Sequence, residues 1–168
     1  MVLSGRDAGF SLVELMVVLA IAGLAASAVV LSFSRGDGLA RSEGQRLAAR
    51  LGAARDAAVI GGQPMAVDVD PLGYAFSRRA GGVWAKPGEA SLQARAWPAG
   101  LVIRLDGGRL DGGQDHRRVI FDGMGMASAA MTVQLAPQGR ESVNRDWGGV
   151  AVVLARDGEV SLSGGSAP

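Results

Sequence analysis

Phe10 and Glu14 are the two residues whose types and spacing most clearly suggest chemistry. Glu14 is the single ionisable side chain between Phe10 and Phe33, and a carboxylate inside an apolar membrane segment costs up to about 3 kcal/mol. A cut between Gly9 and Phe10 would create an amine four residues from Glu14. Residues i and i+4 of a helix lie about 5–6 Å apart, so this amine, or that of a neighbouring chain, would give the carboxylate a cation.

Other reactive groups are few. His116 is the only histidine and there is no cysteine, which excludes His–His, Cys–His and Cys-based sites within the chain; we expect His116 to lie in an exposed loop. Asp68 and Asp70 have the spacing of a calcium pair, but alternate carboxylates on a strand more often face solvent, and the EF-hand pattern is absent. Because nucleotide-binding and serine-hydrolase motifs are also absent, we expect no enzyme activity, no metal and no cofactor.

The composition is that of one globular domain with an added segment. The 168 residues are 48% hydrophobic and include 26 glycines, which is too apolar for a disordered chain. Seventeen basic residues against 16 acidic ones give a net charge of +1. A balance so close to neutral provides no overall field to attract nucleic acid or an acidic membrane surface.

The segment 10–33 is long enough to span a membrane. At ~1.5 Å per residue it would cover roughly 36 Å as a helix, against a hydrocarbon core of about 30 Å. Three interpretations fit it: a secretory signal cleaved after the small residues 26–28, a plain amino-terminal anchor oriented by Arg6, or a helix kept whole after removal of a short leader, 1–9. Only the third gives the carboxylate in this segment a partner.

Residues 34–64 predict a hinge followed by an amphipathic helix. Two glycines in 34–38 weaken a helix there. From Leu39 to Ile60 the apolar residues follow a spacing of three or four, and Gly61 to Pro64 then ends the helix. The expected apolar stripe, which should pack against a sheet, consists of Leu47, Leu51, Ala54 and Ala58.

Residues 65–168 alternate between apolar and polar side chains, which predicts antiparallel strands. We expect Val67 and Val69 on the core face of the strand 65–70, and a hairpin whose connection is residues 78–82. A polar, glycine-rich stretch, 106–118, should form a mobile surface loop. The other expected strands are 92–97, 101–105, 119–121, 131–136, 150–155 and 159–163. The predicted fold class is therefore α+β, a long amino-terminal helix packed on antiparallel β-sheets.

The stretch from Gly9 to Leu15, GFSLVEL, resembles the leader signature of type IV pilins and type II secretion pseudopilins. This resemblance implies that a prepilin peptidase cuts after Gly9 and that Phe10 becomes the N-methylated terminus. It further implies that Glu14 pairs with the amino terminus of an adjacent subunit during fibre assembly.

Within that superfamily, the chain is similar to GspH-type minor pseudopilins over most of its length. The similar segments are 46–64, 74–84, 119–125 and 152–160. In this family, a proline often stands shortly after the phenylalanine that corresponds to Phe121, at the place where this chain has Gly123 or Met124. The carboxyl end, from Ser161 to Pro168, has no carboxylates and so differs from the calcium loop of major pseudopilins.

The resemblance implies a single-pass protein of the bacterial inner membrane, with leader 1–9, transmembrane helix 10–33, hinge and helix 34–64, and a periplasmic β-rich domain 65–168. It would join the tip of a pseudopilus that exports folded proteins across the outer membrane. Its implied partners are other pseudopilins, the prepilin peptidase, the assembly platform and secreted cargo. The alternative is a FimT-like minor type IV pilin that serves pilus assembly or DNA uptake; nucleic-acid binding would require clustered arginines, and the chain has only two adjacent pairs, 78–79 and 117–118.

Overall fold

A computed structural model describes residues 12–110, 115–139 and 149–164; for residues 26–37, 109 and 110 it describes the backbone alone. The chain divides into two compact units, 1–35 and 36–168. One helix, α1 (Leu12–Gly61), begins in the first unit and ends in the second. Within the described ranges, no helix has the length and hydropathy needed to cross a membrane.

The first unit contains the amino-terminal part of α1. The expected membrane segment 10–33 lies partly outside the described residues. Where side chains are described, from Leu12 to Leu24, the large apolar ones are each more than half exposed. A helix that is apolar all around needs apolar surroundings on every side.

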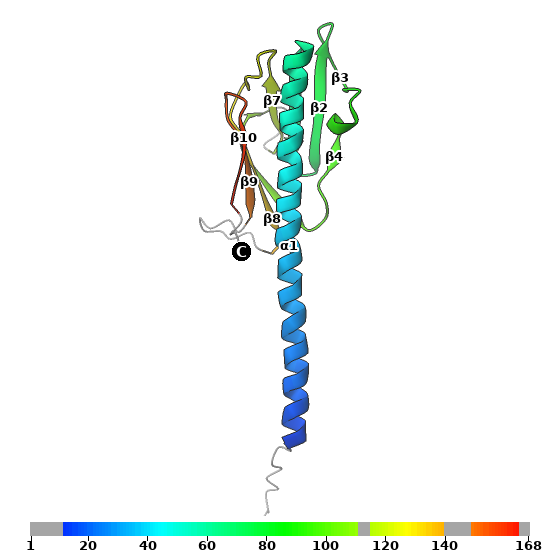
Figure 1. The fold of residues 1–168 in the computed structure, drawn as a ribbon, viewed down its shortest axis with the longest axis vertical. Coiled ribbons are helices and arrows are strands. Elements are labelled where there is room, and N and C mark those ends of the chain that lie inside the picture. The colour runs from blue at the N-terminus through cyan, green and yellow to red at the C-terminus, as the bar shows by residue number, and fades with distance from the viewer. Residues whose placement is uncertain (1–11, 111–114, 140–148, 165–168) are drawn as a thin grey trace, which may run out of the picture. The chain divides into compact units, whose positions relative to one another are not determined.

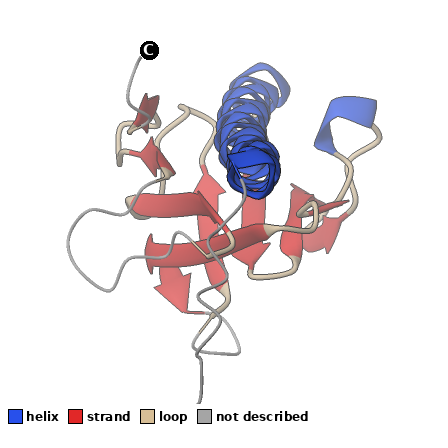
Figure 2. Ribbon diagram, turned by 90° about the horizontal axis from the view of Figure 1, so that it is seen from below, coloured by secondary structure: helices blue, strands red, loops and turns tan. Residues whose placement is uncertain are grey.

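The second unit contains two antiparallel sheets. One has the order β3-β2-β1-β7-β6 with β4 paired to β2, and the other has the order β10-β9-β8-β5. Figures 1 and 2 show the carboxyl-terminal half of α1 lying against these sheets. The strands are β1 (Met65–Asp70), β2 (Gly73–Ala80), β3 (Val83–Ala85), β4 (Arg95–Ala96), β5 (Leu101–Gly107), β6 (Arg109–Leu110), β7 (Arg117–Phe121), β8 (Met131–Pro137), β9 (Val150–Leu154) and β10 (Val160–Ser163).

The core lies between α1 and both sheets, as the helical spacing predicted. Leu47, Leu51, Ala54 and Ala58 have no exposed surface and belong to one cluster with the inward residues of β1, β7, β8 and β9. Burial of each leucine stabilises the fold by roughly 1.5–3 kcal/mol. Gly44 lets the helix approach β9, because a Cβ there would lie 3.1 Å from Val150 Cγ1.

The expected helix, strand 65–70 and hairpin are confirmed, and the alternation that puts Val67 and Val69 in the core is correct. The connection expected over 78–82 is too long, since β2 continues to Ala80 and the turn is Gly81-Gly82, whose φ angles of 58° and 85° suit a two-residue turn. The backbone of 34–38 is helical, and a hinge there stays a prediction.

Two other expectations for the β-rich part are wrong. Instead of one strand, the stretch 92–97 contains the last residue of a short 3₁₀ helix, Ala90–Leu92, and the two-residue β4. Leu92 is buried by that helical turn, so its apolar character does not report a strand. The ends of the stretch 106–118 are paired: β5 continues to Gly107, and β6 pairs with β7, because main-chain groups there complete the sheet edges.

Candidate functional site

The residues that the sequence singled out for processing lie at the start of the chain. Gly9 and Phe10 lie outside the described residues. Glu14 is in the first turn of α1 and is exposed, among exposed apolar neighbours. The helix dipole favours a carboxylate in a first turn. Glu14 is thus accessible at the surface of the helix.

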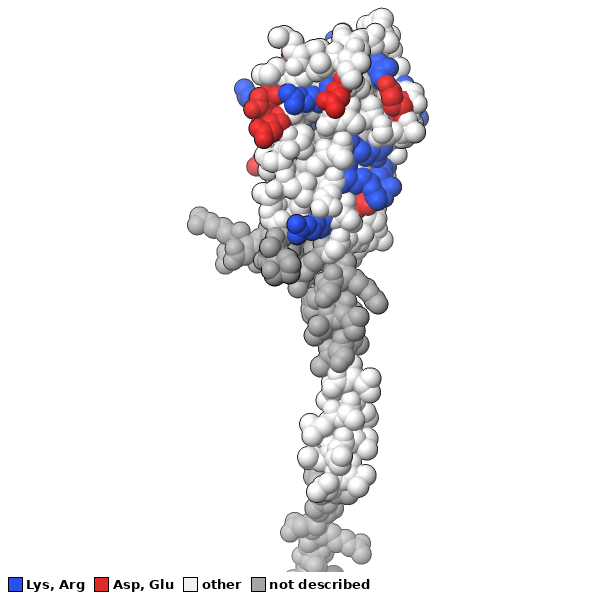
Figure 3. Space-filling view, viewed as in Figure 1, with Lys and Arg blue, Asp and Glu red and all other residues white. Residues whose placement is uncertain are grey.

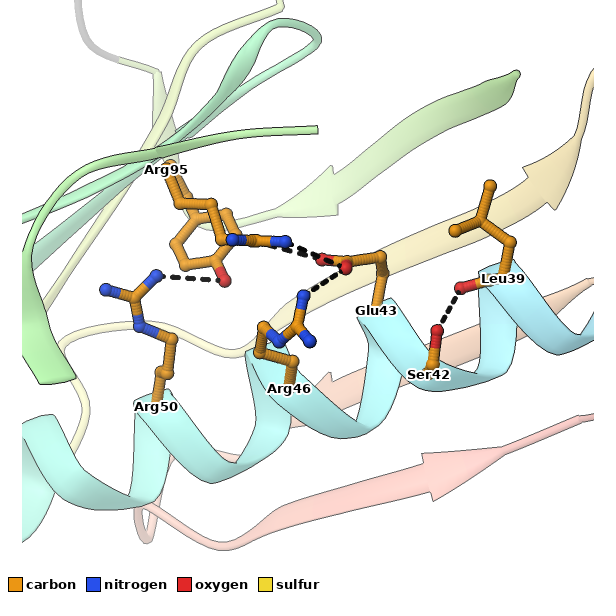
Figure 4. Close-up of polar contacts among 7 residues, drawn as sticks. Leu39, Ser42, Glu43, Arg46, Arg50 and Arg95 are labelled. Atoms are coloured by element: carbon orange, nitrogen blue, oxygen red, sulfur yellow. Dashed lines mark hydrogen bonds and ion pairs between the residues drawn. The ribbon is translucent and has the colours of Figure 1, made fainter. Parts of the chain in front are cut away.

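A second group of charged residues joins α1 to the sheet, and sequence reasoning did not find it. Glu43 is the one buried charged side chain of the described residues, with 3% exposure. Arg95, on β4, reaches both of its oxygens, with Nη2 3.1 Å from Oε1 and Nε 3.3 Å from Oε2. Arg46 donates from Nη1 to Oε1 at 2.5 Å, as Figure 4 shows. The hydrogen bond to Glu43 raises the pKa of Arg95 above its ordinary value.

Arg50 holds the segment between β3 and β4 against the helix. Its Nε donates to Ser91 O at 2.6 Å, Nη2 donates to Gln93 O, and Nη1 lies 3.2 Å from the hydroxyl of Tyr74. Its guanidinium carbon also lies 5.1 Å from the centre of the Tyr74 ring, a cation–π distance. Arg50 therefore satisfies backbone carbonyls of a segment that has little secondary structure of its own.

Arg55 has a similar role nearer the carboxyl end of α1. Its Nε donates to Gly125 O at 3.1 Å and its Nη2 to Asp157 O at 3.3 Å. The two acceptors belong to the turn after β7 and to the turn between β9 and β10. Asp122 orders the first of these turns, because its Oδ1 accepts the N–H groups of Met124 and Met126, both at 2.9 Å.

Asp68 and Asp70, the candidate calcium pair, are engaged by other groups. Asp68 accepts two bonds from Arg118, at 2.7 and 2.9 Å. Asp70 Oδ1 accepts the N–H groups of Leu72 and Gly73 at 2.7 and 2.8 Å. These contacts explain why two carboxylates stand on alternate positions of β1 without invoking an ion.

His116 directly precedes β7, outside any strand as expected, but it is half-buried where we expected an exposed side chain. Its side chain is 32% exposed, and its Nε2 lies 3.5 Å from Asp68 Oδ1. The difference arises because β7 pairs with β1 and so brings the residue beside the Asp68 carboxylate. Sequence alone does not reveal this pairing, since 48 positions, from 68 to 116, separate the two residues.

The fold brings together one arginine from each of the two pairs that are distant in sequence. Arg79 from one pair and Arg118 from the other lie 5.8 and 6.0 Å from the ring of Trp84. The reason is that β1 lies between β2 and β7, and β3 carries Trp84 at the edge next to β2. Asp68, however, neutralises Arg118 within this group.

Comparison with protein families matches nearly the whole chain. The prokaryotic N-terminal methylation motif matches residues 4–30, and the family described as type II transport protein GspH matches residues 43–158. No significant match was found among curated protein sequences.

Solved structures with the same fold come from two kinds of system. The minor pseudopilin EpsH of the type 2 secretion system of Vibrio cholerae is 18% identical, with 74% of this chain and 96% of that one covered and a TM-score of 0.59. Escherichia coli GspH is 17% identical, with 76% and 89% covered and a TM-score of 0.56. The type IV minor pilin FimU of Pseudomonas aeruginosa is 20% identical, with 73% and 87% covered and a TM-score of 0.52.

Proposed function

Because this chain belongs to the GspH family of type II transport proteins and is a minor pseudopilin by that membership, we propose that it is a structural subunit at or near the tip of the pseudopilus. In this role it helps to export folded proteins across the outer membrane. Its partners are other minor and major pseudopilins, the inner-membrane assembly platform and secreted cargo. The observation that carries the proposal is the GspH match over 43–158 on a helix-and-sheet fold.

The amino-terminal residues supply the assembly chemistry of this proposal. A prepilin peptidase cuts between Gly9 and Phe10, and the new terminus at Phe10 is methylated. Glu14 then pairs with the terminus of a neighbouring subunit. Two observations support these roles: the methylation-motif match over 4–30, and the exposed position of Glu14 in the first turn of α1.

The same proposal gives the chain its location. The segment 10–33 anchors it as a single pass in the bacterial inner membrane, and the β-rich domain, 65–168, lies in the periplasm. The apolar side chains from Leu12 to Leu24, each more than half exposed, support a lipid or fibre environment for this part of α1.

The work of the chain is mechanical in this proposal, and it is not an enzyme. The polar clusters around Glu43, Arg50 and Arg55 support that role, because each joins α1 to turns or strands of the sheets. A subunit that bears load along a fibre needs such links between its helix and its sheets.

Mass spectrometry of the mature amino terminus tests the proposal, with cells that have or lack their prepilin peptidase. We expect a chain that begins with N-methylated Phe10, formed only when the peptidase is present. A chain that begins after Ala28 would overturn the proposal, because the anchor and Glu14 would have been removed. The variant Glu14→Gln should abolish incorporation into the pseudopilus, whereas Gln45→Ala, an exposed change on the same helix, should not.

A minor type IV pilin involved in pilus assembly or DNA uptake is the second candidate. The likeness to FimU and the gathering of Arg79 and Arg118 on Trp84 favour it. Phosphate contacts dominate nucleic-acid affinity and weaken with salt. Salt-dependent binding of duplex DNA, lost when both arginine pairs are replaced by glutamine, would support this candidate. No binding at an ionic strength of about 0.01 M, where the Debye length is about 30 Å, would exclude it.

A further inference from the structure

A hollow of about 380 Å³ lies where α1 borders the segment that leads into β4. Arg46 and Arg50 line it from the helix, Arg95 lines it from β4, and small or polar residues of 90–94 form the rest of its wall. Figure 3 shows basic side chains gathered on the side where Figure 1 places β4. The hollow is therefore a concave surface with three guanidinium groups.

The charges around this hollow do not balance. Glu43 is the one described carboxylate that forms ion pairs with these arginines, and it pairs with Arg46 and Arg95. Arg50 bonds to two carbonyls and a hydroxyl, so no described carboxylate neutralises it. Three cations and one anion leave two positive charges in excess.

The excess is larger than the fold itself needs. Arg95 alone reaches both oxygens of Glu43. Arg46 and Arg50 stand one helical turn apart, where like charges repel. Such a cluster is less stable by itself than with an added anion, which points to a ligand.

The arginines are also accessible to a ligand. The side chain of Arg46 is 47% exposed and that of Arg95 is 38% exposed. Arg46 uses one nitrogen, Nη1, on Glu43, while a guanidinium has five N–H donors in a planar fork that matches a carboxylate. The hollow can thus accept a carboxylate without losing the contact to Glu43.

We infer that this hollow, named here the arginine hollow and lined by Arg46, Arg50 and Arg95, binds an aspartate or glutamate side chain of a neighbouring pseudopilin. The inference rests on the proposed function, since it requires a fibre of several subunits. Charge complementarity selects the occupant: an acidic segment from the adjacent subunit neutralises the excess, and the hollow accommodates a side chain rather than a folded element.

A photo-crosslinking amino acid at Ala90, on the wall of the arginine hollow, tests this inference in the full-length chain. The chain is expressed in its membrane together with the other pseudopilins of its secretion system. We expect a crosslink to one of them, mapped by mass spectrometry to a peptide with an exposed aspartate or glutamate. A crosslink to lipid alone, or to a peptide without a carboxylate, would overturn the inference.

The charge itself is tested by Arg46→Gln, with Arg41→Gln as the matched control. Arg41 is exposed on the same helix and lies outside the hollow. Loss of a partly exposed charge pair should reduce the crosslink about fivefold, while the control leaves it unchanged. Reversal of the mapped acid to lysine should abolish the crosslink, and Arg46→Glu should restore it.

Failure of this inference can be told apart from failure of the proposed function. If Arg46→Gln crosslinks as strongly as the unaltered chain and still enters the pseudopilus, the arginine hollow is not a binding site, and the proposed function stands. If the unaltered chain crosslinks to no pseudopilin from Ala90 and is absent from the fibre, both fall.

Discussion

Arg95 on β4 donates from two nitrogens to the two oxygens of Glu43 on α1, across 52 residues of sequence. This pair joins a two-residue strand, which has few main-chain bonds, to the buried face of the helix. Removing one partner of a buried ion pair is costly because a charge remains without compensation. The contact therefore determines where the segment before β5 lies.

The variant Arg95→Ala should destabilise the chain by about 1–3 kcal/mol, because Glu43 keeps one cation and loses two hydrogen bonds. Arg46→Ala should cost less, about 0–1 kcal/mol, because that side chain is nearly half exposed and makes one contact. Chemical unfolding of the full chain in detergent, followed by tryptophan fluorescence, measures both values. Equal losses of stability in the two variants would contradict the larger role assigned to Arg95.

Ionisation of Glu89 should make the stability of the chain depend on pH in the acid range. A hydrogen bond from its own main-chain N–H, and next the side chain of Arg78, lower the pKa of Glu89 from its ordinary value. The folded state then favours the ionised carboxylate more than the unfolded state does. The stabilisation is complete above the unfolded pKa and is lost as the pH falls through the folded pKa.

Glu89→Gln should therefore lower stability at pH 7, and the stabilities of the variant and unaltered chains should converge as the pH falls through the folded pKa of Glu89. Thermal unfolding across that range is the measurement. Glu159→Gln, at an exposed position, controls for the loss of one negative charge. A difference of the same size at both ends of the range would show that the ion pair is not its source.

Sequence reasoning reached the fold because its signals were local and periodic. The spacing of Leu47, Leu51, Ala54 and Ala58 reported one buried helix face, and alternation reported the core face of β1. It failed at the expected strand 92–97, where Leu92 ends a 3₁₀ turn and side chains such as Arg50 satisfy the main chain. The sequence of this segment has no helical or alternating apolar pattern, because a side chain distant in sequence holds it in place.

Some residues of the candidate site could also be found from a local signal in the sequence, and others could not. Glu14 was found because a carboxylate within an apolar segment is conspicuous in any sequence. Glu43 carries a weaker signal: it lies four residues before Leu47, on the apolar face of the helix, and so predicts a buried partner. Neither Arg95 nor the convergence on Trp84 is visible without the register of the strands.

Leu51→Ala should destabilise the second unit strongly. Leu51 has no exposed surface and packs in the cluster shared by α1 and both sheets. Truncation of a fully buried leucine costs about 2–5 kcal/mol, through lost burial and the cavity that remains. Gln45→Ala, an exposed change on the same helix, should alter stability by less than about 0.5 kcal/mol. A loss below 1 kcal/mol for Leu51→Ala, compared with that expected range, would contradict the packing described here.

Gly158→Ala should distort two turns at once. Gly158 has a φ of 80°, and a Cβ there would lie 2.0 Å from Gly125 O and 2.8 Å from Arg55 Nε. Gly81 also has a positive φ, 58°, but a Cβ there would meet no atom within 4 Å. Gly81→Ala therefore carries the backbone cost alone, about 1–2 kcal/mol for a residue held in the left-handed region.

The comparison of these two variants separates the backbone cost from the contact. We expect Gly158→Ala to cost at least about 1 kcal/mol more than Gly81→Ala, the scale of an overpacked contact, because Gly125 O, which accepts the hydrogen bond from Arg55 Nε, must move. Gly158→Ala should also increase proteolytic cleavage in the turn 122–126, which the hydrogen bond from Arg55 to Gly125 O holds against α1. Equal losses of stability, with no change in cleavage, would show that the close approach of the two turns does not stabilise the fold.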